Sequence, residues 1–125
     1  MRLLLDTHIL LWTMQSPRRL SAAARAIILG APQIYVSSVS IWEVAIKVAN
    51  RKLKVDVDIL ISNIADSGFF MLDITYAHAA AVANLPLIHR DPFDRMLVAQ
   101  AMCEPMKLLT ADRVLADYSP LVEVI

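Results

Sequence analysis

Five short apolar runs alternate with longer stretches of helical periodicity along this 125-residue chain. The runs are rich in Leu, Ile, Val, Tyr and Phe and lack alternating polar positions, so strands built from them would be buried on both faces. Such strands, separated by helices, are typical of a parallel sheet. We therefore predict an α/β fold, with a central parallel sheet of about five strands and helices on both faces. The expected strands lie near residues 2–5, 34–36, 69–74, 107–110 and 121–125, and the expected helices over 7–15, 21–29, 40–52, 57–67, 75–85 and 92–102.

The length of the chain fits a single domain over residues 1–125, with room for a sizeable core. Apolar residues make up 58% of the sequence, above the usual ~45–50%. A chain of this size buries only about two-thirds of its unfolded surface. We therefore expect the surplus apolar surface to be covered by another chain, in a homodimer, in a complex with a partner, or in both.

Twelve basic and twelve acidic residues cancel, so no overall charge draws the chain to nucleic acid. A short basic run, Arg51, Lys52 and Lys54, is interpreted as a solvated helix end, with a local nucleic-acid-binding patch as the alternative. Cys103 is the only cysteine, which excludes an internal disulfide and fits a reducing cytoplasm. Asp6 interrupts the apolar N-terminal segment well short of a membrane span, so we expect a cytoplasmic protein with no membrane segment.

Acidic residues near the ends of the expected strands each have a local explanation as helix caps. Asp6 and Asp112 directly follow apolar runs and suit N-caps. Ser40 and Glu43 have the spacing of a capping box at the start of a helix. Capping explains these acids one at a time, without any function.

The stretch HRDPFDRMLVAQA, residues 89–101, has the same two interpretations. Asp91 suits the N-cap, Pro92 the first helical position and Asp94 the third, from which its carboxylate can reach back to unpaired backbone N–H groups. The alternative is that Asp94 points into a site shared with the other acids. We expect Asp94 to do both.

The topology predicts that the acids meet. Residues just beyond the carboxyl ends of parallel strands converge at one edge of the sheet, which would bring Asp6, Glu43, Asp94 and Asp112 together. Two carboxylates about 4 Å apart repel by about 4 kcal/mol at an effective dielectric constant near 20. Such a pocket needs protons or a divalent cation, and oxygen ligands favour Mg²⁺ or Mn²⁺. A cation of this kind can activate water and stabilise the charge on a phosphodiester as its bond breaks, so the acids favour metal-dependent hydrolysis.

Four segments, in this order and spacing, resemble the PIN-domain nucleases, and more narrowly the VapC-type toxins of toxin–antitoxin pairs. They are LLLDTHILLW, VSSVSIWEVAIKVANRKLKV, HRDPFDRMLVAQA and LLTADRVLADY. The resemblance covers nearly the whole chain, with Gln100 as a departure in the alanine-rich end of the third segment. It implies a PIN-like fold and a Mg²⁺- or Mn²⁺-dependent endoribonuclease. Such an enzyme cuts RNA, slows growth and is held in check by a small cognate antitoxin.

The resemblance also implies roles for individual residues. The acids of the family fall on Asp6, Glu43, Asp94 and Asp112, which would be the catalytic metal ligands. Asp91, three residues before Asp94, is interpreted as the cap and remains the alternative ligand.

Polar neighbours of these acids are further candidates. Thr110, in a Thr-x-Asp pattern, is expected to hydrogen-bond a ligand. Thr7 would orient the first acid or meet a phosphate, with a plain helix-start hydroxyl as the alternative. Lys47 would neutralise the pocket or bind phosphate, or else form an ordinary surface ion pair. His89 and Arg90 border the expected site and are candidates for contact with RNA.

Two other functions remain open at this point. In a phosphatase or phosphotransferase resembling the haloacid-dehalogenase group, Asp6 would attack phosphate, but those sites need Asp-x-Asp and position 8 is His8. A non-catalytic, receiver-like or partner-binding α/β domain is the third interpretation, although Asp73 lies inside an apolar run. Trp12 and Trp42 are expected to anchor the core or an interface rather than to stack on bases.

Overall fold

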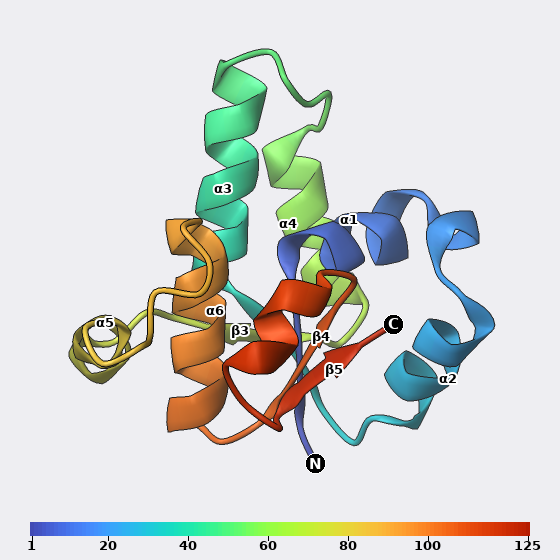
Figure 1. The fold of residues 1–125 in the computed structure, drawn as a ribbon. Helices are drawn as coiled ribbons and strands as arrows, with labels where there is room; N and C mark the ends of the chain where they lie inside the picture. Colours follow the sequence, from blue (N-terminus) through green and yellow to red (C-terminus); the bar gives the residue numbers. More distant parts are fainter.

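The computed structural model describes residues 1–125 and contains one sheet of five parallel strands in the order β3-β2-β1-β4-β5 (Figure 1). Leu5 of β1 is aligned with Val36 of β2 and Leu109 of β4, so the carboxyl ends of these three strands lie at one edge. The predicted parallel α/β fold is confirmed. The strands are β1 (Leu3–Leu5), β2 (Ile34–Ser37), β3 (Phe70–Leu72), β4 (Lys107–Thr110) and β5 (Val122–Val124).

Helices connect the strands in the order expected from the sequence. None of them combines the length and the apolarity needed to cross a bilayer. The α-helices are α1 (Thr7–Gln15), α2 (Ala22–Gly30), α3 (Ser38–Ala49), α4 (Val57–Asp66), α5 (Tyr76–Val82) and α6 (Pro92–Cys103), and the 3-10 helices are η1 (Pro17–Arg19) and η2 (Arg113–Asp117).

Alternate residues of β1 enter two different hydrophobic clusters. Leu3 and Leu5 pack with side chains from α1, α2, α3 and α4, whereas Leu4 packs with side chains from α6 and η2. Successive side chains of a strand point to opposite faces of a sheet, so helices cover both faces. Figure 1 shows α5 and α6 on one side of the strands and α1 and α2 on the other.

Helix caps fix the chain where it leaves the strands. Asp6 is the N-cap of α1 and Asp91 the N-cap of α6, while Asp112 caps the short helix η2. These three predicted caps are confirmed. Asp6 directly follows β1, and Asp112 lies two residues after the end of β4. Both capping side chains therefore lie at the C-terminal edge of the sheet.

The start of α3 differs from the prediction. The helix begins at Ser38, directly after β2, and its N-cap is Ser37, whose hydroxyl accepts the N–H of Val39 at 3.1 Å. The predicted capping box of Ser40 and Glu43 is therefore wrong. Glu43 lies in the second turn instead, with only 4% of its surface exposed, so it is a buried acid rather than a capping group.

Candidate active site

Three of the predicted acids line one cavity of about 300 Å³ at the carboxyl edge of the sheet. Asp6 follows β1, Asp94 lies in the first turn of α6 and Asp112 follows β4. We call this space the acid cavity. His8 and Trp12 of α1 also line it, so it is bounded by groups from segments far apart in the sequence.

Asp6 is held by hydrogen bonds to both of its carboxylate oxygens. Oδ1 accepts the backbone N–H of Ile9 at 2.8 Å, and Oδ2 accepts the hydroxyl of Thr110. The same Thr110 hydroxyl accepts the backbone N–H of Asp112 at 3.0 Å. Burial raises the pKa of Asp6, although the Thr110 and Ile9 hydrogen bonds oppose this. Thr110 therefore connects the acid after β1 to the acid after β4.

Asp94 also has a carboxyl group with a raised pKa. Burial, and then the charges of Asp91, Asp6 and Glu43, raise its pKa to about 7, while His89 acts in the opposite direction. Its side chain is 21% exposed. A carboxyl group in this position takes up a proton near neutral pH unless a cation replaces that proton.

Asp94 does not reach back to cap α6, and this part of its predicted double role is wrong. Oδ1 of Asp91 accepts the N–H groups of Phe93 at 2.8 Å and of Asp94 at 3.3 Å. The N–H of Asp91, which a capping box would pair with Asp94, donates instead to Nδ1 of His89 at 3.0 Å. The Asp94 carboxylate is thus left to face the acid cavity.

His89 lies between two of the acids. Its Nε2 is 3.0 Å from Oδ2 of Asp112 and 3.6 Å from Oδ2 of Asp94. Each of the three residues offers one atom that could bind a metal ion, and these atoms lie within 4.8 Å of one another. Because Nδ1 accepts the N–H of Asp91, the neutral ring carries its proton on Nε2 and donates it to Asp112. No local spacing links residue 89 to residue 112, so the sequence does not predict this contact.

Glu43 approaches the acids from α3. Oε2 accepts Nζ of Lys47 at 2.9 Å, in an ion pair in which the glutamate side chain is 5% exposed. Oε1 is buried and has no hydrogen-bond partner. The Glu43 charge also contributes to the raised pKa of both Asp6 and Asp94. A buried carboxylate oxygen without a partner is costly, and a cation would satisfy it, so the residues present fit a divalent metal ion.

The other candidates occupy different places. Thr7 is buried, and its hydroxyl donates to the Ser40 hydroxyl at 3.0 Å, which joins α1 to α3. Lys47 is half-buried beside Glu43. Arg90 is exposed and does not line the acid cavity.

Comparison with known proteins identifies the fold. A family model described as the PIN domain matches residues 3–120. The chain belongs to the PIN domain family. Its sequence is 30% identical over 118 residues to Ribonuclease VapC22 of Mycobacterium tuberculosis, an alignment that covers 92% of this chain and 90% of that protein. The resemblance to PIN-domain and VapC-type proteins is confirmed.

Several solved structures share the fold at lower sequence identity. The VapBC2 structure from Rickettsia felis, bound to a promoter DNA fragment, gives a TM-score of 0.72 at 14% identity and covers 100% of this chain and 99% of that chain. A toxin–antitoxin complex from Klebsiella pneumoniae gives 0.68 at 21% identity, with 97% and 95% covered. FitAcB from Neisseria gonorrhoeae gives 0.68 at 19% identity, with 96% and 95% covered.

Proposed function

We propose that this PIN protein is a metal-dependent endoribonuclease that acts as the toxin of a toxin–antitoxin pair. The observation that carries the proposal is the acid cavity, where Asp6, Asp94 and Asp112 meet and the pKa of Asp94 is raised to about 7. Membership of the PIN family supports hydrolysis of a phosphodiester rather than the phosphatase or receiver-like alternatives. The name of the Mycobacterium tuberculosis relative supports RNA as the substrate.

Asp6, Glu43, Asp94 and Asp112 would hold the ion. Their carboxylate oxygens suit Mg²⁺ or Mn²⁺ better than a softer metal. When bound, such an ion stabilises charge on the phosphodiester and makes water a better nucleophile. Asp91 is assigned to the cap, because its Oδ1 already accepts two backbone N–H groups.

Neighbouring side chains would keep these acids in position. The Thr110 hydroxyl orients Asp6, and Nε2 of His89 orients Asp112 through its hydrogen bond. Lys47 compensates part of the charge of Glu43. Each of these contacts fixes a carboxylate before substrate arrives, which is the kind of preorganisation that metal sites depend on.

We further propose a small cognate antitoxin and a homodimer. Large apolar side chains on the surface support a covering partner, since Trp42 is 58% exposed, Met71 63%, Leu87 78% and Tyr76 97%. The Rickettsia felis and Klebsiella pneumoniae structures are of toxin–antitoxin complexes, and they support a partner of the same kind here.

Mapping of RNA ends after brief expression tests the proposed activity. Wild type should produce new RNA ends and arrest growth, and Asp6→Asn should do neither. Asparagine is also a good N-cap, so this variant keeps the start of α1. If the same ends appear with Asp6→Asn, the acid cavity is not the active site.

Two variants three residues apart, at the N-cap and in the first turn of α6, separate coordination from capping. Asp94→Asn should abolish cleavage. Asp91→Asn should retain most of it, because asparagine accepts the same backbone N–H groups. The reverse result would move the metal ligand from Asp94 to Asp91.

A further inference from the structure

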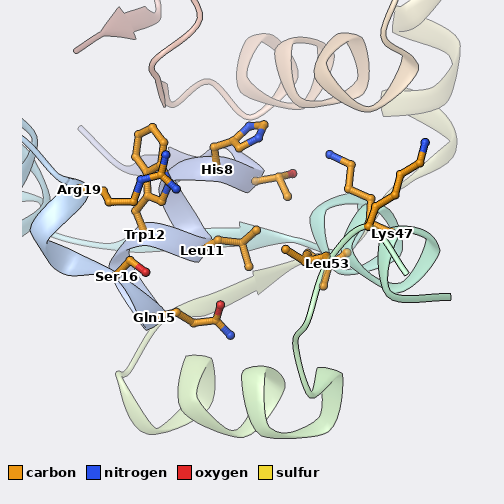
Figure 2. Close-up of a pocket in the computed structure, with 11 residues that line it drawn as sticks. His8, Leu11, Trp12, Gln15, Ser16, Arg19, Lys47 and Leu53 are labelled. Atoms are coloured by element: carbon orange, nitrogen blue, oxygen red, sulfur yellow. The ribbon is translucent and has the colours of Figure 1, made fainter. Parts of the chain in front are cut away.

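A second and larger cavity adjoins the acid cavity. Its volume is about 540 Å³, and it is lined by residues of α1, η1, α3 and the loop after α3 (Figure 2). His8 and Trp12 line both cavities. The residues that line the second cavity include three basic residues, Arg19, Lys47 and Lys52, and no acidic residue. We call this space the basic cavity.

Two of the cations, Arg19 and Lys47, lie on opposite sides of the basic cavity (Figure 2). The guanidinium carbon of Arg19 lies 5.0 Å from the centre of the Trp12 ring, a cation–π arrangement that positions the charge. Figure 2 shows Arg19 and Trp12 on one side and Lys47 on the opposite side. Lys47 is paired with Glu43, but neither Arg19 nor Lys52 forms a salt bridge. In a chain with no net charge, Arg19 and Lys52 therefore contribute local positive charge that no salt bridge neutralises.

The rest of the basic cavity has a mixed lining, in which four apolar side chains are accompanied by the polar or titratable residues Thr7, His8, Gln15 and Ser16. Leu11, Val44 and Leu53 line it together with Trp12. Its volume falls within the ~300–1,000 Å³ typical of ligand sites. Apolar side chains beside cations suit an unstacked base attached to phosphates, as in other single-strand binding sites. The bases of double-helical RNA are stacked and hidden from such a pocket.

We propose that the basic cavity binds the nucleotide next to the bond that is cut in single-stranded RNA. Arg19, Lys47 and Lys52 would contact its phosphates, and its base would lie against the apolar side chains. This inference rests on the proposed ribonuclease function. The shared residues His8 and Trp12 allow one strand to pass from one cavity to the other. An acidic antitoxin segment would match the cations alone, whereas a nucleotide uses both the cations for its phosphate and Leu11, Val44 and Leu53 for its base, so RNA is the better occupant.

The test measures binding in the full chain carrying Asp6→Asn, which prevents cleavage. The ligand is a single-stranded RNA oligonucleotide that spans a cleavage site found by the mapping of RNA ends. Its affinity for the protein is measured by fluorescence anisotropy over a range of KCl concentrations. Arg19→Gln and Lys52→Gln should each weaken binding about tenfold at low salt. The double variant should reduce the slope of log K against log[salt] by about 1.4, at about 0.7 for each phosphate contact.

Matched controls lie beside each tested residue. Arg18 and Lys54 are exposed, carry the same charges and do not line the basic cavity. Arg18→Gln and Lys54→Gln should therefore leave both the affinity and the salt slope nearly unchanged. Equal effects in the tested and control variants would overturn the proposal. Displacement of the RNA by polyglutamate as efficiently as by unlabelled RNA would also overturn it, because the cavity would then bind any polyanion.

Cleavage with the native Asp6 separates this inference from the proposed function. The Arg19→Gln/Lys52→Gln variant should raise KM and leave kcat nearly unchanged, because it loses binding in the ground state and the transition state alike. If wild type cuts the RNA and this variant matches the controls, only the nucleotide site is wrong. If no Asp6-dependent RNA ends are found, the function and the nucleotide site are both wrong.

Discussion

Replacing Asp94 by asparagine should stabilise the metal-free protein above pH 7. The carboxyl group is surrounded by the acids Asp91, Asp6 and Glu43, and burial together with these charges raises its pKa from 3.8 to about 7. Ionised Asp94 is therefore unfavourable in the folded, metal-free protein. Asparagine has nearly the same shape and carries no charge, so it removes this cost.

The sign of the pH dependence follows from the raised pKa. Below pH 3.8 the carboxyl group is protonated in both the folded and the unfolded chain. Between pH 3.8 and about 7 only the unfolded chain loses the proton, so the wild type loses stability as the pH rises through this range. Above about pH 7 the loss is complete. Burial raises the pKa of Asp6 as well, so the variant retains a pH dependence of the same sign.

The magnitude follows from the size of the shift. Raising the pKa of Asp94 from 3.8 to about 7 corresponds to about 4 kcal/mol, because each tenfold change in proton affinity is worth about 1.36 kcal/mol. The Asp94 side chain is 21% exposed, so water and small movements of neighbouring side chains reduce the cost of ionising it in the folded protein. We expect Asp94→Asn to raise the free energy of unfolding by roughly 2–4 kcal/mol near pH 8, which is about 10 °C in Tm for a domain of this size.

The assay is urea or thermal unfolding in EDTA between about pH 4 and pH 8. Wild type and Asp94→Asn should be similar at the acid end and diverge toward neutral pH. Millimolar Mg²⁺ or Mn²⁺ should then stabilise the wild type at pH 8 by about 2–3 kcal/mol near 100-fold saturation, and the variant much less. Asp66→Asn, at an exposed acid that ends α4, is the control and should follow the wild type. Parallel pH profiles for wild type and Asp94→Asn would refute the assignment.

Three other substitutions test the site and its support. Thr110→Val should lower Mn²⁺ affinity by about 10–100-fold in calorimetric titration, because it removes the hydrogen bonds to Asp6 and to the N–H of Asp112; unchanged affinity would show that Thr110 does not position the site. Leu4→Ala should cost about 2–5 kcal/mol in urea unfolding, since Leu4 is 0% exposed, and a cost below about 1 kcal/mol would contradict its place in the core. Gly68→Ala should cost about 1–2 kcal/mol, because Gly68 has φ of 75° while nothing lies within 4 Å of an added Cβ; a neutral result would mean that the turn relaxes.

The parallel sheet is predictable because the sequences of its strands indicate burial on both faces. Runs such as Leu3–Leu5 have no polar position, and this property alone requires cover on both faces. The start of α3 was not predictable in the same way, because Ser37, Ser38 and Ser40 can all cap a helix. Two features select Ser37 as the N-cap. Helix α3 begins immediately after β2, without a loop, and the Ser40 hydroxyl accepts a hydrogen bond from Thr7. Both are tertiary features that a local pattern does not contain.

His89 and Lys52 show what the sequence leaves undetermined. The N–H of His89 donates to the Tyr118 hydroxyl at 2.7 Å, which fixes the loop before α6 and aims the imidazole at Asp112. Lys52 belongs to a basic run that looks like a solvated helix end. Arg51 has a left-handed backbone with φ of 59°, which reverses the chain after α3, and Lys52 then lines the basic cavity. In both cases a backbone path, not a motif, decides which side chain meets the site.

Capping of a helix and coordination of a cation are compatible at Asp6 and Asp112. A carboxylate has two oxygens and about four lone-pair positions. Oδ1 of Asp112 accepts the N–H of Val114, while its Oδ2 faces His89. Oδ1 of Asp6 likewise accepts a helix N–H, while Oδ2 accepts the Thr110 hydroxyl and retains lone pairs for a cation. A helix N-terminus therefore holds one oxygen still and presents the other to the cavity. On α6 the two tasks fall on different residues, because the N–H that Asp94 would need for capping already pairs with His89.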